Sequence, residues 1–310
     1  MAAVSSSAVP QRTADPDVSP EEILEKGNEA YKKGDIKEAE KLYYAAVRRV
    51  EAAYGSNDPR LARSLIKLST VYFPHELQVP ILLIGEVVPY PGAYRMGHFV
   101  IGMPLTQRRV PQTGMDHYRR RYLPARPLLE RAVSILERSL GPEDAEVADA
   151  LEELGALHIA MGDYNRAELR FERMLAIREK NLGIDNPELI RDLNTLAFVK
   201  RIQRNLRDAL AAAQRAVLLL QEDATFVLRA ATLYSLAAVQ MELKDFQSAE
   251  KLLSDCLSAQ DGQGGRERVG TLMFLYREHA FVLEKLKRKK EARQQEKRAS
   301  EMQKILERQK

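Results

Sequence analysis

The chain has 310 residues, of which 45% are hydrophobic and 30% charged, enough for one large domain or two ordinary ones. No unbroken apolar run reaches the roughly 18 residues of a membrane-spanning helix, and a single cysteine cannot build a disulfide framework. These features argue against a membrane-spanning protein and a disulfide-stabilised secreted domain. Few aromatic residues and abundant Ala, Leu, Glu, Lys and Arg favour helices over sheets.

The net charge of +4 is unevenly distributed along the chain. The segment from Lys285 to Lys310 holds 11 Lys or Arg and 4 Glu, a net of +7, so the rest carries −3. The C-terminal segment is therefore the basic part of a mildly acidic protein.

Residues 1–20 are small, polar and proline-rich, and we expect them to be disordered. They lack the apolar core of a secretory signal and the arginine-rich, acid-poor composition of a transit peptide. We expect a cytoplasmic protein, with nuclear import left open by a basic run near the C-terminus and organellar import disfavoured.

A repeat of about 42 residues organises the chain. Related sequences begin at Gly34 (GDIKEAEKLYYAAV), Gly162 (GDYNRAELRFERML) and Lys244 (KDFQSAEKLLSDCL), and each has an alanine five residues on. This anchor alanine recurs at intervals of 86, 42, 42, 40 and 43 residues, and the first interval is one repeat plus about 44 residues. The six anchors are Ala39, Ala125, Ala167, Ala209, Ala249 and Ala292.

Two further places in each repeat hold small residues. Twelve residues before the anchors lie Gly27, Gly155, Ala197, Ala237 and Ala280, with Ser69 in the interrupted copy. Seven residues after the anchors lie Ala46, Ala132, Met174, Ala216, Cys256 and Ala299, and five of these six are small. Helices packed as hairpins approach closely only where side chains are short, so these positions predict paired helices that stack on one another.

Each repeat has the pattern of two helices. In the fourth repeat, Pro187 is expected to open the first helix, and the second helix is expected from about Arg207 to Leu220. Glycine and proline in the connecting loops give the usual stop and start signals. The sequence therefore predicts an all-α fold, an α-solenoid of six helix–turn–helix repeats.

The small residues at Gly27, Ala39 and Ala46 and the GDY-like turns resemble the tetratricopeptide repeat. The longer period and the segment Leu175–Ala197 resemble the variant found in kinesin light chains. The resemblance covers about 240 residues, and it implies a non-enzymatic scaffold or adaptor that binds proteins. The coiled coil that joins kinesin light chains to their motor is not seen here, so the resemblance does not extend to cargo transport.

Residues 74–117 interrupt the second repeat. They hold 6 of the 14 prolines and 5 of the 16 glycines, and their apolar residues have no helical period. Three interpretations stay open: a flexible excursion, a small hairpin from 81–88 and 93–101, or residues added by a misjoined gene model. The predicted divisions are a disordered 1–20, a first repeat and a half in 21–73, this insertion, the remaining solenoid in 118–300, and a basic helical tail in 301–310.

The concave wall of such a solenoid is lined by the first helix of each repeat. Polar side chains there can hydrogen-bond an extended peptide, although a solvated helix face would look the same in sequence. The sequence does not fix the charge of the ligand. The side chains predicted to face this groove are Asp149, Glu152, Arg191, Asn194, Tyr234 and Arg277.

Some related repeats hold the C-terminal tails of chaperones through a carboxylate clamp of Lys, Asn, Asn, Lys and Arg. The matching positions here are Leu24, Asn28, Lys67, Asp149 and Glu153. Four of the five differ, and two carry the opposite charge, which would repel a carboxylate. The sequence does not support this function.

No catalytic, metal-binding or cofactor-binding arrangement is predicted. The five histidines have no metal-ligand spacing, and we interpret His158 as a packed side chain. Cys256 occupies a small-residue position and is interpreted as core packing, while the glycines at 262–265 are interpreted as a linker between repeats.

The basic tail favours one alternative function. Its run Lys287–Lys290 could direct nuclear import or contact nucleic acid. No aromatic residues alternate with these basic residues, so base stacking is not expected. The other interpretation is the polar helix that caps a solenoid, with a thin apolar stripe at Ala292, Ala299, Met302 and Leu306.

Overall fold

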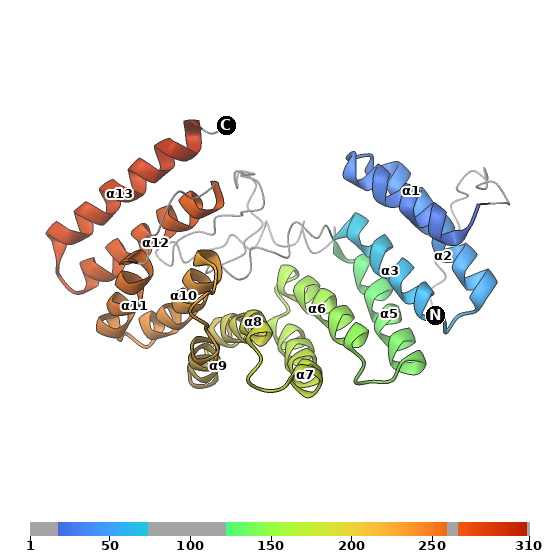
Figure 1. Ribbon diagram of the computed structural model, residues 1–310, viewed down its shortest axis with the longest axis horizontal. Coiled ribbons are helices and arrows are strands. Elements are labelled where there is room, and N and C mark those ends of the chain that lie inside the picture. The colour runs from blue at the N-terminus through green and yellow to red at the C-terminus, as the bar shows by residue number, and fades with distance from the viewer. Residues whose placement is uncertain (1–17, 74–121, 259–265, 309–310) are drawn as a thin grey trace.

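The computed structural model describes residues 18–73, 122–258 and 266–308. Within these ranges the chain forms helices and no strand, and consecutive helices pack as six antiparallel hairpins along an arch (Figure 1). The predicted all-α solenoid is confirmed. We call the two helices of each hairpin helix A and helix B.

The hairpins follow one another in chain order, with a short 3-10 turn at Pro187–Leu189 before α8. The pairs are α1 (Pro20–Lys32) with α2 (Ile36–Tyr54), α3 (Pro59–Tyr72) with α5 (Ala125–Ser139), α6 (Ala145–Ala160) with α7 (Tyr164–Leu182), α8 (Ile190–Ile202) with α9 (Leu206–Leu218), α10 (Phe226–Glu242) with α11 (Phe246–Ser258), and α12 (Arg266–Lys285) with α13 (Lys289–Arg308).

The turn has one recurring geometry in the first, third, fourth and fifth hairpins. Four residues before the anchor alanine, an Asp or Asn side chain accepts a backbone N–H of the first turn of helix B, as Asp35 does from Glu38 at 3.1 Å. The residue before this cap has a positive φ. Glycine supplies it at Gly34 and Gly162, whereas Lys244 adopts φ +66° at the cost that a side chain brings to this region.

The small residues lie where helices A and B meet. A Cβ atom added at Gly27 would lie 2.7 Å from Cε1 of Tyr43, and one added at Gly155 would lie 2.8 Å from Cζ of Phe171. Glycine is therefore needed where helix B presents an aromatic ring four residues after its anchor. The predicted structural positions Gly27, Ala39, Gly155, Ala167, Ala197, Ala209, Ala237 and Ala249 are all buried.

The apolar core follows the stack but is divided. One cluster extends from Ala39 to Ala216 and a second from Ala230 to Leu306. A small group of Ala197, Ala213 and Leu236 lies between them. The division falls between the fourth and fifth repeats.

The second hairpin forms although its two helices are separated in sequence. Helices α3 and α5 pack together, and the rings of Phe73 and Tyr122 meet edge to face with centroids 5.4 Å apart. The predicted insertion at 74–117 lies outside the described residues, as do residues 1–17 and the glycines at 262–265. Helix α1 begins at Pro20, capped by Ser19.

The basic segment from Lys285 to Arg308 belongs to two helices. Helix α12 ends at Lys285, and α13 begins at Lys289 after a turn in which Lys287 has φ +63°. This turn is the sixth copy of the hairpin turn, so the region is an A–B junction. Helix α13 continues unbroken through residue 300, so the expected boundary at 301 does not coincide with the end of an element.

Candidate functional site

The A helices of the central repeats form the inner face of the arch. In Figure 1, α3, α6, α8 and α10 lie on the inner side, while α5, α7, α9 and α11 lie on the outer side. This arrangement follows from the short side chains that seat each B helix against its A helix. The six predicted groove residues lie on α6, α8, α10 and α12.

Four of those six side chains are exposed: Asp149, Glu152, Arg191 and Arg277. Arg277 donates to Oε1 of Gln303 on α13 at 2.8 Å. Asp149 and Glu152 lie one turn apart on α6 and contact the same arginine. The polar character expected of this face is therefore present on α6, α8 and α12.

Asn194 and Tyr234 differ from our expectation, because they are only 2% and 4% exposed. Asn194 donates from Nδ2 to the hydroxyl of Thr232 on α10 at 3.0 Å, and Tyr234 packs edge to face against Phe274 of α12. The hydroxyl of Tyr234 donates to Glu278 at 3.4 Å. As placed, these two side chains join neighbouring A helices, and their predicted role toward a ligand stays a prediction.

Arg178 organises the charged side chains between the third and fourth repeats. It lies near the end of α7, and its guanidinium donates to Asp149 at 2.8 Å, Glu152 at 2.6 Å and Asp192 at 2.7 Å. Its hydrogen bonds hold the exposed carboxylates of α6 in fixed positions and tie α6 to α8.

Asp192 is the buried member of this cluster. Burial raises its pKa to about 6, against the opposing effect of Arg178, while Glu152 raises it further. Its Oδ2 atom has no hydrogen-bond partner. The exposed carboxylates of Asp149 and Glu152 add to the negative charge around one guanidinium, so the cluster carries more negative than positive charge.

Sequence reasoning did not find Arg178 or Asp192. It counted inward positions on A helices alone, whereas Arg178 belongs to a B helix and reaches between two A helices. One signal was present: an arginine near the end of α7 with carboxylates on both neighbouring A helices.

The outer B helices are joined by a ladder of arginine–glutamate pairs. An arginine six residues after one anchor pairs with a glutamate twelve residues after the preceding anchor. The three pairs are Arg131 with Glu51, Arg173 with Glu137, and Arg215 with Glu179. Arg215 also donates to the backbone oxygen of Ile184 at 2.6 Å, in the loop between repeats.

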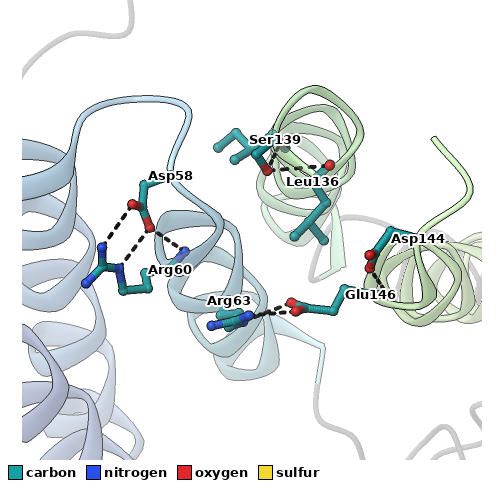
Figure 2. A network of polar contacts seen from close by, with 8 residues as sticks. Asp58, Arg60, Arg63, Leu136, Ser139, Asp144 and Glu146 are labelled. Atoms are coloured by element: carbon teal, nitrogen blue, oxygen red, sulfur yellow. Dashed lines mark hydrogen bonds and ion pairs between the residues drawn. The ribbon is translucent and has the colours of Figure 1, made fainter. Parts of the chain in front are cut away.

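The joint between the second and third repeats is seen closely in Figure 2. Arg63 of α3 forms a two-pronged ion pair with Glu146 of α6, at 2.8 and 2.6 Å. In the same view Asp58 caps the backbone N–H of Arg60, and Asp144 caps that of Glu146. The second and third A helices are thereby linked across the point where the sequence is interrupted.

Comparison with known proteins identifies this architecture. Residues 115–180 match the family model of the tetratricopeptide repeat. The chain has the fold of a tetratricopeptide repeat solenoid. No curated protein matches it in sequence.

Solved structures with this fold include kinesin light chain repeats of Podosopora anserina, described as nearly identical TPR-like repeats. A single-substitution variant of these repeats has a TM-score of 0.52 and 21% identity, covering 63% of this chain and 93% of that one. A second structure of these repeats has a TM-score of 0.50 and 20% identity, covering 61% of this chain and 91% of that one. BtubC (BKLC) from P. vanneervenii has a TM-score of 0.51 and 18% identity, covering 79% of this chain and 83% of that one. The predicted kinesin-light-chain-like form of the repeat is confirmed at the level of the fold.

The remaining sequence candidates have structural places in the repeats. Cys256 is buried on α11, and burial raises its pKa to about 12. In the described part of the chain, no three His, Cys, Asp or Glu side chains come together as metal ligands. None of the described helices is long and apolar enough to cross a membrane.

The basic C-terminal helix packs on the last A helix of the solenoid. Ala292, Ala299 and Leu306 of α13 are buried, and the guanidinium of Arg298 lies over the ring of Tyr276 on α12. This arrangement fits a terminal capping helix. Neither the family match nor the structural neighbours support the alternative of a nucleic-acid or nuclear factor.

Proposed function

We propose that this tetratricopeptide repeat chain is a protein-binding scaffold, an adaptor that holds a peptide segment or partner protein on the inner face of its arch. The observation that carries the proposal is the set of exposed polar side chains on consecutive A helices, namely Asp149, Glu152, Arg191 and Arg277. Curved helical repeats use such faces to bind extended segments.

The contacts of Arg178 support the proposal. A side chain that is already fixed loses less conformational entropy when a ligand binds it. Asp149 and Glu152 each accept a hydrogen bond from Arg178 and leave one carboxylate oxygen for a ligand donor. Exposed Arg191, on the adjacent α8, supplies the opposite charge for a ligand carboxylate or backbone oxygen.

The proposal gives the chain no catalytic step of its own and places it in the cytoplasm. Binding a partner would use the inner face as a surface, with affinity from several weak polar contacts and the curvature of the arch. Turnover of a small molecule by the purified chain would contradict the non-enzymatic part.

Partner capture by the immobilised full chain tests the proposal. We expect the variant Asp149→Ala with Arg191→Ala to lose most of the partners that the wild type retains, as measured by quantitative mass spectrometry. The matched control is Arg138→Ala with Asp255→Ala, which also removes one charge of each sign but from the outer helices α5 and α11. Equal capture by both variants would refute inner-face binding.

A further inference from the structure

The joint between the second and third repeats contains buried nitrogen atoms without hydrogen-bond partners. His158 on α6 is 1% exposed, and neither Nδ1 nor Nε2 of its ring is paired. The Nε atoms of Arg126 on α5 and Arg170 on α7 are also buried and unpaired. Unpaired buried polar groups are rare in folded proteins because each loses its hydration without replacement.

The charges around His158 are mostly positive. Arg170, Arg166 and Arg126 act on the imidazole and, together with the larger effect of burial, lower its pKa to about 4. Asp163 opposes them, but it pairs with Arg166 at 3.2 Å and caps α7. The imidazole is therefore neutral at pH 7 and lies beside positively charged guanidinium groups.

Arg126 and Arg170 have few negative neighbours of their own. Arg126 reaches Glu130, one turn along its helix, only at 3.9 Å. In the described part of the chain, no carboxylate lies within ion-pair distance of Arg170. Both side chains are partly exposed, so an ion from solution can approach their guanidinium groups.

The joint between the third and fourth repeats has a basic side chain in the same place, and there it is paired with acids. Lys200 of α8 occupies the place of His158, three residues after the small residue of helix A. It donates to Glu168 at 2.5 Å and Glu172 at 2.6 Å on the preceding B helix. A basic side chain on helix A therefore meets acids there.

The joint between the first two repeats also has an acid on its B helix. Tyr72 of α3 donates to Glu40 of α2 at 2.6 Å. Glu40 and Glu168 each follow an anchor alanine directly, and the residue in that place on α5 is Arg126. At the joint of His158 a base thus replaces the acid found at these two joints, and the negative charge that completes them is missing.

We propose that this joint binds a phosphate group between the side chains of Arg126 and Arg170. Two planar guanidinium groups match the oxygens of a phosphate, and they bind it more specifically than a point charge would. The bound anion would also favour a proton on His158, which would turn an unpaired ring nitrogen into a third donor. A phosphate group carries more negative charge than a carboxylate and three acceptor oxygens, so it matches two guanidinium groups and an imidazolium better.

The test titrates the full chain with inorganic phosphate at constant ionic strength and follows the His158 imidazole by NMR. The signal is assigned from its loss in His158→Gln. We expect a saturable shift and a rise of at least one unit in the pKa of His158. Arg126→Gln with Arg170→Gln should weaken phosphate binding at least tenfold, whereas Arg138→Gln, an exposed arginine of the same helix α5, should leave it unchanged.

A second arm identifies the source of the phosphate group. The peptide Gly-Ser-Gly-phosphoserine-Gly-Ser and its unphosphorylated form are titrated in the same way. Tighter binding of the phosphopeptide than of inorganic phosphate would assign the site to a modified protein segment, and equal or weaker binding would assign it to the free ion.

Two results would overturn the proposal. One is a wild-type chain that gives no saturable response to either phosphate probe. The other is a double variant, folded by circular dichroism, that binds as tightly as the wild type. If the double variant unfolds, Arg170→Gln alone replaces it, because the described structure shows no ion pair for that side chain to lose.

Discussion

The first four repeats and the last two are joined by different contacts. Arginine–glutamate pairs link α2, α5, α7 and α9 above a continuous apolar core. This ladder ends at α9, because the next two places hold Gln221 and Asp255. From the fourth repeat onward, buried polar contacts join the A helices instead, such as Asn194 with Thr232 and Arg201 with Glu242.

The difference shows that one repeat architecture tolerates two kinds of joint. The stability that apolar packing contributes falls gradually with the side-chain volume that is removed. A buried polar contact instead leaves an unpaired polar group when one partner is removed. Exposed ion pairs contribute little in either case. The same loss of one side-chain group should therefore have different effects in the two regions.

The largest effect is expected from Gly155→Ala in the apolar region. The new methyl group would lie 2.8 Å from a ring carbon of buried Phe171, so we expect destabilisation of about 3 kcal/mol in urea unfolding. Phe171→Leu should relieve the overlap, because the fifth repeat pairs Ala237 with Leu253. If the double variant loses as much unfolding free energy as the two single variants lose together, the steric explanation is wrong.

A smaller effect is expected from Thr232→Val in the polar region. The change keeps the volume but leaves the buried Nδ2 of Asn194 without its acceptor, which should cost about 2 kcal/mol. Thr195→Val is the control, since its hydroxyl donates only to the carbonyl of Arg191 on the same helix. Equal urea midpoints for the two variants would mean that the A-helix contact does not stabilise this joint.

His158 is the polar exception within the apolar region and predicts a dependence on pH. Its pKa is about 4 in the folded chain and 6.5 unfolded, so the unfolded state binds the proton first. In phosphate-free buffer, stability should fall as the pH drops from 6.5 toward 4, by on the order of 2 kcal/mol. His158→Leu should remove this slope, and an unchanged slope in thermal unfolding would assign it to other groups.

The smallest effect is expected in the ladder. Arg131→Ala should cost about 0.5 kcal/mol at low salt and almost nothing at high salt, because the pair with Glu51 is exposed. Arg138→Ala on the same helix is the control. A loss in Arg131→Ala that persists at about 1 M NaCl would show that packing of the arginine stem, and not its charge, joins these helices.

The repeat register was predictable from sequence because it has a steric cause. Helices A and B approach closely at the small residues, and a Cβ atom added at Gly27 or Gly155 would meet an aromatic ring of helix B. The burial of Asn194 and Tyr234 could not be predicted from sequence. Counting positions along one helix shows which way a side chain faces, but not whether the neighbouring helix covers it. Thr232 and Phe274, which cover them, come from the next repeats.

The charged clusters were only partly within reach of the sequence. Asp149 and Glu152 were found from their place on helix A, but Arg178, which holds them, lies on helix B. The unusual joint at His158 could have been noticed by aligning Arg126 with Glu40 and Glu168. The unpaired atoms at this joint come from three helices, α5, α6 and α7. The spacing of residues along one helix cannot predict them.

Phe73 and Tyr122 lie 49 positions apart in the sequence, yet their rings are in contact. The helices of this hairpin can therefore pack together whatever the length of the chain between them. Their ring centroids are 5.4 Å apart, a span that a turn of a few residues could bridge, as in the other hairpins. In general, a flexible connection of about 48 residues costs only about 2 kcal/mol more to close than one of about five, because the entropy grows with the logarithm of length. An engineered chain with a short linker in that place should keep every helix contact and unfold at a higher temperature, so this hairpin is a natural point for grafting foreign segments.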